Sequence, residues 1–330
     1  MGSVLVPYLR ARFPTCHLIG FDRGYFAHLL TGAHFAPEIL LNEQHYGDIR
    51  KFPYTLLQGV DFVIHLAALS NDPMGNEFDS ETLEINYLSS VKLALSASEK
   101  NVKGFIFASS CSVYGLADKG SRNEQSQTSP LTHYARSKVL TERELQAANL
   151  DSMQCTCLRF ATACGMSDRL RLDLVLNDFV ASAITLNEIT VLSDGTPWRP
   201  LIDVEDMCRA IDWAISREFS YENQFLSINV GSNDSNYQVI DLAQAVAHRV
   251  DKAKISLNSN APNDSRSYKV DFSLFAKLAP GAIQCSLDQT IDNLIEGLDR
   301  MKFNDINFRS SNLIRLNAIR KKSNSLAFRD

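Results

Sequence analysis

Tyr134 and Lys138 are the two residues in this sequence whose spacing is best suited to chemistry. They stand four residues apart in a segment of helical pattern, so the phenol and the ammonium lie on one helix face. A neighbouring cation favours the phenolate and lowers the pKa of a tyrosine from about 10, which makes the phenol a proton carrier near neutral pH. The spacing alone arises easily by chance, so its context decides its meaning.

A serine-rich turn, Ser109–Gly115 (SSCSVYG), directly follows the apolar run Gly104–Ala108 (GFIFA). If this run is a strand of a parallel sheet, the hydroxyls stand at its carboxyl end, where doubly wound sheets bind ligands. For each serine alone, a capping hydroxyl is the structural alternative. The turn therefore strengthens the case that Tyr134 and Lys138 belong to a site.

Asp22 ends the apolar run His17–Phe21 (HLIGF). A carboxylate in this place binds the adenosine ribose of a dinucleotide, about 20 residues after a glycine-rich turn. Gly2 has the matching position, and the helix-like start SVLVPYL follows it, as it would follow the last glycine of such a turn. For Asp22 alone, an ordinary turn residue is the alternative.

The elements that must position these residues alternate along the first two thirds of the chain. Apolar runs with few alternating polar residues predict strands buried on both faces of a parallel sheet. They are His17–Phe21, Phe62–Leu66, Gly104–Ala108, Cys155–Phe160 and Leu226–Val230, with helical patterns at Ser3–Arg12, Ser80–Lys100 and Tyr134–Asn149. Repeated strand–helix units predict an α/β fold with a doubly wound parallel sheet.

The last third of the chain has a different pattern. Amphipathic helices are predicted at Tyr237–Val250 and Ser286–Met301, and the polar segment Ala253–Arg266 predicts a loop. The tail Phe308–Asp330 carries six basic residues against one acid. We interpret this tail as a solvated terminal helix that frays, and the alternative is a surface that binds an anion or a partner.

Composition excludes several classes of protein. Apolar residues make up 45% and charged residues 22% of the 330 residues, which fits one large or two smaller globular domains. The net charge of −5 argues against nucleic-acid binding. No apolar run reaches the ~18 residues of a membrane span, and the start lacks a signal peptide pattern. The seven cysteines follow no disulfide or metal spacing, so we expect reduced thiols, no metal and a cytoplasmic protein.

Further segments match a known family jointly and in order. They are Gly47–Arg50, His65–Ala68, Asn86, Ser109–Gly115, Tyr134–Lys138, Leu158–Phe160 and Gly195–Val204. On these motifs, most of the chain resembles the extended short-chain dehydrogenase/reductase family, in particular the NAD-dependent nucleotide-sugar epimerases and dehydratases. The resemblance implies a Rossmann-like NAD-binding domain over residues 1–160, completed by residues 201–231. It implies a smaller substrate-binding lobe over residues 161–200 and 232–330.

The resemblance also implies roles for single residues. Ser110, Tyr134 and Lys138 would form the catalytic set, with Tyr134 as the acid/base. The residues expected to bind NAD are Gly2, Asp22, Asp48, Ile49, Leu66, Ala67, Ala68, Tyr134 and Lys138, and the Asp22 carboxylate would favour NAD over NADP. The residues expected to bind the diphosphate of a sugar nucleotide are Thr162, Asn177, Arg199 and Arg266. For each arginine, a surface ion pair is the alternative.

Two departures from the family pattern matter. Cys111 and Ser112 stand where the dehydratases carry the Asp-Glu pair used for elimination, which argues against 4,6-dehydration.

The family's first strand and glycine-rich turn have no counterpart before Gly2. That strand is central in the sheet, so its neighbours would lie about 10 Å apart with unpaired edges. We therefore expect a misplaced start, and we expect the chain from Met1 to be less stable and to bind NAD poorly.

Three functions remain open on this reasoning. The leading one is an epimerase in which Tyr134 takes a hydroxyl proton while hydride passes to NAD and later returns to the other face of the sugar. The second is a reductase of 4-keto sugar nucleotides, and the third is a non-catalytic protein that senses the cofactor. The resemblance further implies a homodimer through the helices at residues 82–100 and 134–149, with Leu83, Val91, Leu95 and Val139 at the contact.

Overall fold

The computed structural model describes residues 1–33, 35–218, 224–258 and 267–323. Arg266, one of the two arginines predicted to bind phosphate, lies outside the described residues. None of the helices in these ranges is long and apolar enough to cross a membrane. All seven cysteines are free thiols.

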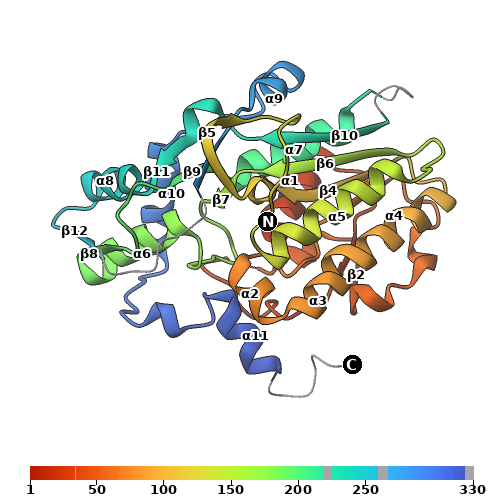
Figure 1. Ribbon diagram of the computed structural model, residues 1–330. Helices are drawn as coiled ribbons and strands as arrows, with labels where there is room; N and C mark the ends of the chain where they lie inside the picture. Colours follow the sequence, from red (N-terminus) through yellow and green to blue (C-terminus); the bar gives the residue numbers. More distant parts are fainter. Residues whose placement is uncertain (34, 219–223, 259–266, 324–330) are drawn as a thin grey trace.

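The main sheet is parallel and has the strand order β10–β6–β4–β3 (Figure 1). Its strands are β3 (Phe62–His65), β4 (Gly104–Ser110), β6 (Gln154–Phe160) and β10 (Phe225–Val230). The predicted strands and the parallel sheet are confirmed, with ends that differ by at most two residues. Because Ser110 pairs with Phe160, the carboxyl ends of β4 and β6 lie at the same edge.

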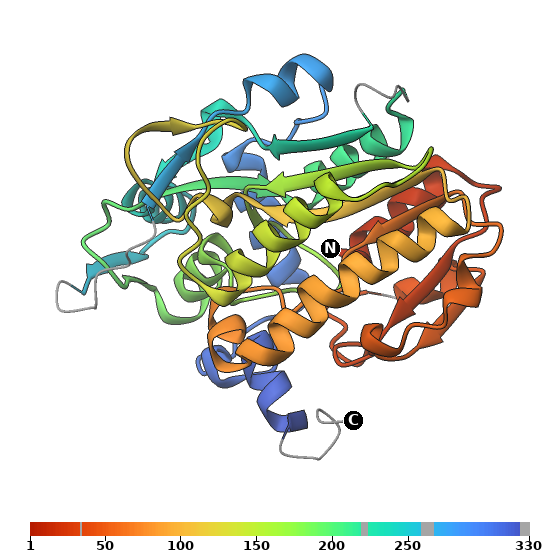
Figure 2. The same cartoon turned by 45° about the vertical axis from the view of Figure 1, so that its right-hand side comes forward.

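A second, two-stranded sheet stands apart from the first (Figure 2). It contains β1 (Ile19–Asp22) and β2 (Glu43–Tyr46), which pair in parallel. Within the described ranges no strand lies between β1 and β3, so each of these two strands has one edge outside any ladder. The sheet is divided at the position where the resemblance places a central strand.

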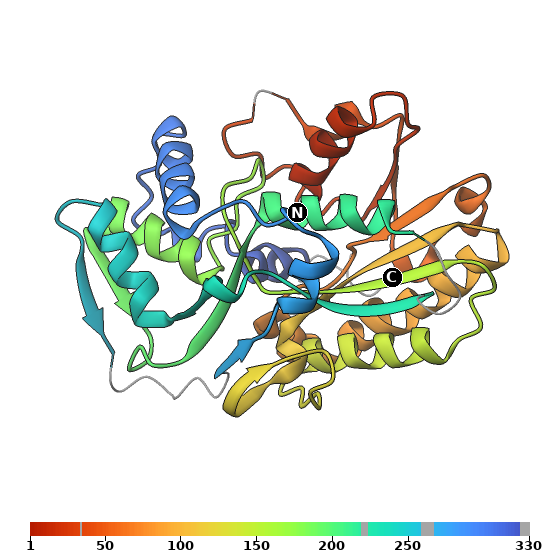
Figure 3. The same cartoon turned by 90° about the horizontal axis from the view of Figure 1, so that it is seen from above.

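Helices cover both faces of the main sheet (Figure 3). One face packs on α1 (Gly2–Arg12) and α7 (Val204–Ser216), and the other packs on α4 (Ser89–Glu99) and α5 (His133–Ala147). Alternate side chains of β4 enter the two cores, with Ile106 on the first face and Phe105 and Phe107 on the second. Burial on both faces explains the unbroken apolar runs of these strands.

The helix predicted over residues 80–100 is divided in three. It consists of α3 (Asp79–Leu83), a π-helical turn over Glu84–Leu88 and α4, and α2 (Asp72–Glu77) precedes it. The π turn carries the buried Asn86. A single π turn of this kind often marks a functional position in a helix.

A second hydrophobic core fills the lobe beside the sheet. Its elements are β7 (Thr162–Cys164), α6 (Val175–Leu186), β8 (Glu188–Val191), β9 (Trp198–Asp203), β11 (Asn236–Gln238), α8 (Val239–Arg249), β12 (Lys254–Leu257) and α10 (Leu287–Arg300). The prediction of a loop from residue 253 onward is wrong for β12, which pairs in parallel with β8. Ile255 in this strand packs on the lobe core, and this contact outweighs the polar composition.

The segment after α8 also reaches the main sheet. Strand β13 (Ser267–Val270) pairs with β5 (Leu116–Arg122), and α9 (Ser273–Leu278) follows it. Phe272 and Phe275 are buried in the core on the α1 and α7 face of the sheet. This part of the carboxyl-terminal third therefore belongs to the first core by its packing.

The prediction of a solvated, fraying tail is wrong for α11 (Arg315–Ser323). Ala318 and Ile319 are only 4% and 2% exposed, and Ile319 packs with Leu69 and Met74. Burial of this short apolar stripe holds the helix against the loop after β3 and against α2, although most of its residues are basic or polar.

Candidate active site

Ser110, Tyr134 and Lys138 come together at the carboxyl end of β4. Ser110 is the last residue of the strand, and its hydroxyl accepts from the amide of Ser112 at 3.1 Å. The same hydroxyl lies near enough to the phenol of Tyr134 to lower the pKa of that phenol. Lys138 lies one turn along α5 from Tyr134 and donates from Nζ to the carbonyl of Ala108 at 2.7 Å. The three side chains thus converge where a doubly wound sheet binds its ligand.

Tyr134 is held in the first turn of α5 by contacts with α2. Thr132 caps α5 by accepting from the amide of Ala135, and its hydroxyl donates to Asp72 at 2.6 Å. Gly75 allows a close approach of the two helices, because a Cβ on it would lie 2.9 Å from the Tyr134 amide nitrogen. Helix α2 therefore fixes the position of the phenol.

Burial sets the proton affinities of the pair. It raises the pKa of Tyr134 to about 12, with a further increase from the Asp72 charge, while the Ser110 hydrogen bond and the Arg171 charge act in the opposite direction. Burial lowers the pKa of Lys138 to about 8, and the charge of Glu142 opposes this shift. The expectation that Lys138 lowers the tyrosine pKa is not met here, because desolvation of the phenol outweighs nearby charges and the ammonium is directed at Ala108.

A buried ion pair lies directly behind Lys138. Glu142, one turn further along α5, accepts from Arg159 Nη2 on β6 at 2.6 Å and also from Arg159 Nε and from the Ser109 hydroxyl. The side chains are 6% and 9% exposed. Arg159 Nη1 also donates to the Tyr114 hydroxyl at 2.9 Å. These bonds join α5 to the carboxyl ends of β4 and β6.

The sequence analysis missed Glu142. Two signals mark it: it stands four residues after Lys138 on the same helix face, and the run CTCLRF contains an arginine in an otherwise apolar strand. A charge inside a buried strand requires a partner of opposite sign.

The predicted cofactor residues lie along the amino-terminal part of the fold. Asp22 is exposed at the carboxyl end of β1, where it accepts from the Gly24 amide at 2.5 Å. Leu66, Ala67 and Ala68 follow β3. The amide of Asn86 clamps the end of this loop by accepting from the Leu69 nitrogen at 2.8 Å and donating to its carbonyl at 3.0 Å.

Asp48 and Ile49 follow β2, the strand beside Asp22. Asp48 accepts from Arg50 Nη2 at 2.7 Å and from its amide at 2.9 Å. Partial burial alone would raise the pKa of Asp48, but the Arg50 hydrogen bonds hold this pKa below its ordinary value. Ile49 is buried in the core under α4.

The amino terminus of α1 suits a diphosphate. No side chain caps it and its first turn contains no acid. Gly2 is exposed, and a Cβ built on it would meet no atom within 4 Å. A helix amino terminus binds phosphate oxygens, and a carboxylate at the end of the first strand binds a ribose. By their chemistry, these residues fit a dinucleotide.

The predicted substrate residues are more deeply built in. Asn177 is 1% exposed and binds the amide of Gly165 at 3.0 Å and the carbonyl of Arg171 at 2.9 Å, so it holds the loop between β7 and α6. Thr162 begins β7. Arg199 is 8% exposed in β9 and donates to the Trp198 carbonyl at 2.8 Å.

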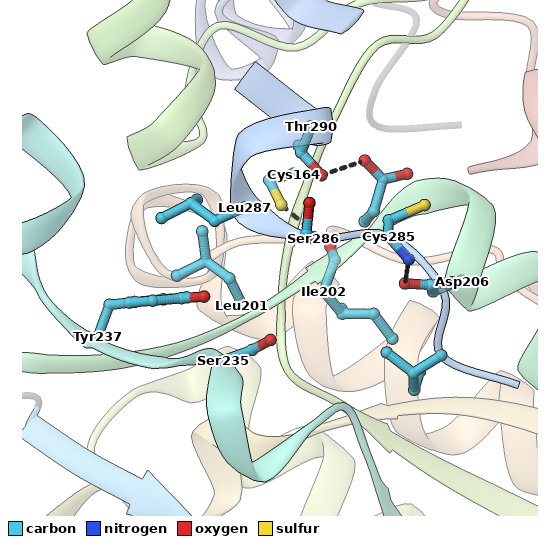
Figure 4. Close-up of a pocket in the computed structure, with 12 residues that line it drawn as sticks. Cys164, Leu201, Ile202, Asp206, Ser235, Tyr237, Cys285, Ser286, Leu287 and Thr290 are labelled. Atoms are coloured by element: carbon cyan, nitrogen blue, oxygen red, sulfur yellow. Dashed lines mark hydrogen bonds between the residues drawn. The ribbon is translucent and has the colours of Figure 1, made fainter. Parts of the chain in front are cut away.

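A separate small pocket lies where β9, α7 and the start of α10 meet (Figure 4). Asp203 accepts from the Thr290 hydroxyl at 2.8 Å, and Asp206 accepts from the Cys285 amide at 3.1 Å. The residues that line this pocket are not those of the predicted site. In the described ranges, no group of three or more His, Cys, Asp or Glu side chains could hold a metal ion.

Cys111 has no acid function in this geometry. Its thiol is 1% exposed and donates to the Arg159 carbonyl at 3.1 Å, and burial raises its pKa. The position that holds an acid in the dehydratases is therefore occupied by a neutral, buried group.

The fold and the site define an α/β protein with a dinucleotide-type sheet and a Ser-Tyr-Lys cluster. The sequence profile of the NAD dependent epimerase/dehydratase family matches residues 1–231, and the chain belongs to this family. The family is one of NAD-dependent enzymes, so the recognition of extended short-chain epimerases and dehydratases from the motifs is confirmed.

Several proteins are similar to this chain. An uncharacterized UDP-glucose epimerase, YtcB of Bacillus subtilis, is 24% identical over 75% of the chain and 77% of its own length. The UDP-glucose 4-epimerase of Lactobacillus helveticus is 24% identical over 57% of the chain and 62% of its own length.

Among solved structures, MoeE5 in complex with UDP-glucuronic acid and NAD is 24% identical, with a TM-score of 0.77 over 91% of this chain and 95% of that one. The UDP-glucuronic acid 4-epimerase of Bacillus cereus is 21% identical, with a TM-score of 0.76 over 91% and 96% of the two chains.

The buried ion pair leads to a stability prediction. Glu142→Met leaves the Arg159 charge buried without a partner, so we expect the free energy of unfolding in urea to fall by about 3–5 kcal/mol. Glu144→Met, at an exposed position of the same helix, is the control and should change it by less than about 0.5 kcal/mol. The double variant Glu142→Met with Arg159→Met should recover most of the loss. A loss below about 1 kcal/mol for Glu142→Met would contradict the assigned role.

Proposed function

We propose that this protein is an NAD-dependent epimerase of nucleotide sugars that oxidises its substrate transiently to a keto sugar. The observation that carries the proposal is the convergence of Ser110, Tyr134 and Lys138 at the carboxyl end of β4, in a chain that belongs to an NAD-dependent epimerase and dehydratase family. The Bacillus subtilis and Lactobacillus helveticus relatives carry the names of UDP-glucose epimerases, and two of the similar structures hold UDP-glucuronic acid. A UDP-hexose or UDP-hexuronic acid is therefore the proposed substrate.

The chain's own residues would handle the proton. A bound nicotinamide would supply the hydride acceptor and hydride donor that the reaction needs. Ser110 would hydrogen-bond the reacting sugar oxygen, and Tyr134, whose phenol lies near the Ser110 hydroxyl, would take and return its proton. Lys138 would orient the cofactor ribose, and its ammonium lies 5.5 Å from the centre of the Tyr134 ring.

Residues around this set would hold the two ligands. Asp22, Asp48, Ile49 and Gly2 would contact the adenosine and diphosphate part of NAD, and the loop Leu66–Ala68 its ribose. On the substrate side, Thr162, Asn177, Arg199 and Arg266 would approach the nucleotide diphosphate. The proposed division is a cofactor domain over residues 1–160 and 201–231 and a substrate lobe over residues 161–200 and 232–330, except that residues 267–278 pack in the core of the cofactor domain.

Tyr134→Phe tests this function directly. The ring and its packing remain while the proton carrier is lost, so we expect epimerisation to fall at least ~10²-fold. Turnover is followed by chromatography and mass spectrometry on UDP-glucose, UDP-glucuronic acid and other nucleotide sugars, with NAD present. Tyr87→Phe, which alters a phenol bonded to the surface residue Glu144, is the matched control.

In this assay an epimerase gives an isobaric product without net formation of NADH. Net consumption of NADH with a 4-keto sugar nucleotide would identify a reductase instead. If Tyr134→Phe keeps more than about a tenth of the wild-type rate, the catalytic assignment is wrong.

The outer surface of α4 and α5 is the proposed dimer interface. Leu88 and Leu95 are 56% and 39% exposed there, and Leu83 and Val91 are half-buried. Val139 does not fit the expected contact, because it is 4% exposed and packs in the core of its own chain.

We expect the wild-type protein to sediment as a dimer at micromolar concentration. Leu95→Lys should shift it to monomer, because a buried ammonium without a partner opposes association. Leu257→Lys, at an exposed position of β12, should leave the dimer intact. A wild-type protein that sediments only as monomer would contradict this interface.

A further inference from the structure

Helix α2, which fixes the position of Tyr134, is too short to be stable by itself. It has six residues, Asp72–Glu77, whereas an isolated helix of fewer than about 12 residues is marginal in water. Yet Asp72 accepts from the Thr132 hydroxyl that caps α5, and Gly75 lies against the backbone of Tyr134. Contacts with other elements must therefore hold α2 in place.

The carboxyl-terminal helix α11 makes such a contact with the middle of α2 and lies beside it (Figure 1). Ile319 of α11 is buried and packs with Met74 of α2 and with Leu69 after β3. Met74 is 1% exposed and directly precedes Gly75. A displacement of Met74 would therefore move the residue that lies against Tyr134.

A second contact of α11 holds the end of α2. Arg320 donates from Nε to Glu77 Oε1 at 2.8 Å and from Nη2 to Glu77 Oε2 at 2.5 Å. A bidentate pair of this kind fixes the orientation of the two side chains as well as their distance. At the start of α2, the cap residue Asn71 donates to Asp173 at 2.7 Å. Helix α2 is thus held from both ends and from its middle.

Helix α11 is itself fixed to two loops of the fold. Arg315, its first residue, donates from Nη2 to the Arg169 carbonyl at 2.8 Å, and its guanidinium lies 4.4 Å from the centre of the Phe26 ring. Just before the helix, the Leu313 carbonyl accepts from the Leu172 amide at 3.1 Å. These bonds make α11 a fixed support for α2.

We propose that α11 positions the phenol of Tyr134, because Ile319 and Arg320 hold α2 and α2 holds the first turn of α5. Both residues act through α2, so they are positioning residues. A reacting group misplaced by about 1 Å can cost ~10²-fold in rate, so loss of this support lowers kcat. The turnover readout rests on the proposed function, whereas the geometric claim is tested without turnover.

Ile319→Ala removes the apolar contact with Met74 and Leu69. We expect kcat for the accepted nucleotide sugar, with NAD present, to fall at least about tenfold. The KM should stay within about twofold of wild type, because the residues proposed to bind the ligands are unchanged. Ile306→Ala makes the same change at an exposed position before α11 and is the matched control, with an unchanged kcat. Assays are run at a temperature at which circular dichroism shows every variant folded.

An exchange of charges tests the second contact. Arg320→Glu places two carboxylates together and should lower kcat at least about threefold. Adding Glu77→Arg restores opposite charges, and the double variant should return to within about twofold of the wild-type kcat. Arg249→Glu, which disrupts the exposed ion pair with Asp292 in the lobe, is the matched control and should leave kcat unchanged.

Hydrogen exchange reports the position of α5 without any substrate. In its first turn, the amides of Ala135 and Arg136 donate to the Thr132 hydroxyl and carbonyl. Mass spectrometry of the peptide over residues 133–138 should show exchange at least about tenfold faster in Ile319→Ala, because the cap loses its support. The amides of β6 should keep their protection, which separates this role from a general loss of stability.

The inference is overturned if Ile319→Ala keeps kcat within about twofold of wild type, or if its 133–138 peptide exchanges as in wild type. Parallel loss of protection in β6 overturns it as well, because the helix would then only stabilise the fold. If Ile319→Ala does not fold, failure of the charge exchange to restore kcat overturns it. A wild-type protein that turns over no nucleotide sugar contradicts the proposed function alone, and the exchange result for Ile319→Ala then decides this inference.

Discussion

The buried ion pair between Glu142 and Arg159 is the interaction on which the geometry of the active site depends. It joins the middle of α5 to β6, and the Ser109 hydroxyl extends the contact to β4. Lys138 stands one turn before Glu142 and also binds β4, because its Nζ donates to the Ala108 carbonyl. Because α5 is fixed at both of these turns, Tyr134 in its first turn is held against Ser110. A helix that slid by one residue would separate the phenol from the hydroxyl and bury an unpaired charge.

The two sides of the site are held by different means. On the catalytic side, continuous strand pairing carries Ser110 and Arg159. On the side of β1 and β2, strand pairing does not connect the neighbouring segments within the described ranges. Side-chain hydrogen bonds join these segments instead. The Asn86 amide holds Leu69 after β3, and the Thr31 hydroxyl bonds Ser167 and Leu170 beyond β7. Helix α11 packs over this side, which places the carboxyl-terminal part of the chain beside the loop after β3 and beside α2.

The sequence was sufficient to predict the strands of the main sheet, because they depend on local patterns. The serine, tyrosine and lysine set stays a prediction, drawn from equally local patterns. Unbroken apolar runs such as Phe62–His65 identify strands covered on both faces, and a spacing of four residues fixes a common helix face. Such reasoning failed where long-range packing decides the outcome. Strand β12 forms because β8 offers it an edge, and Ile319 docks because Leu69 and Met74 accept it. It also failed for the sign of the Tyr134 pKa shift, since local sequence does not report how deeply a phenol is desolvated.

The central claim is that the sugar carbon gives up its hydrogen as hydride to a bound nicotinamide and receives the same hydrogen back. The most direct measurement is the mass of the epimer formed from an accepted UDP-sugar in buffered D₂O. After exchangeable hydroxyl deuterium is washed out, the account predicts a product without carbon-bound deuterium, because the hydride held on the cofactor does not exchange with water. One deuterium per product molecule at the inverted carbon would mean that a proton is removed and replaced, and it would contradict transient oxidation by the site around Ser110, Tyr134 and Lys138.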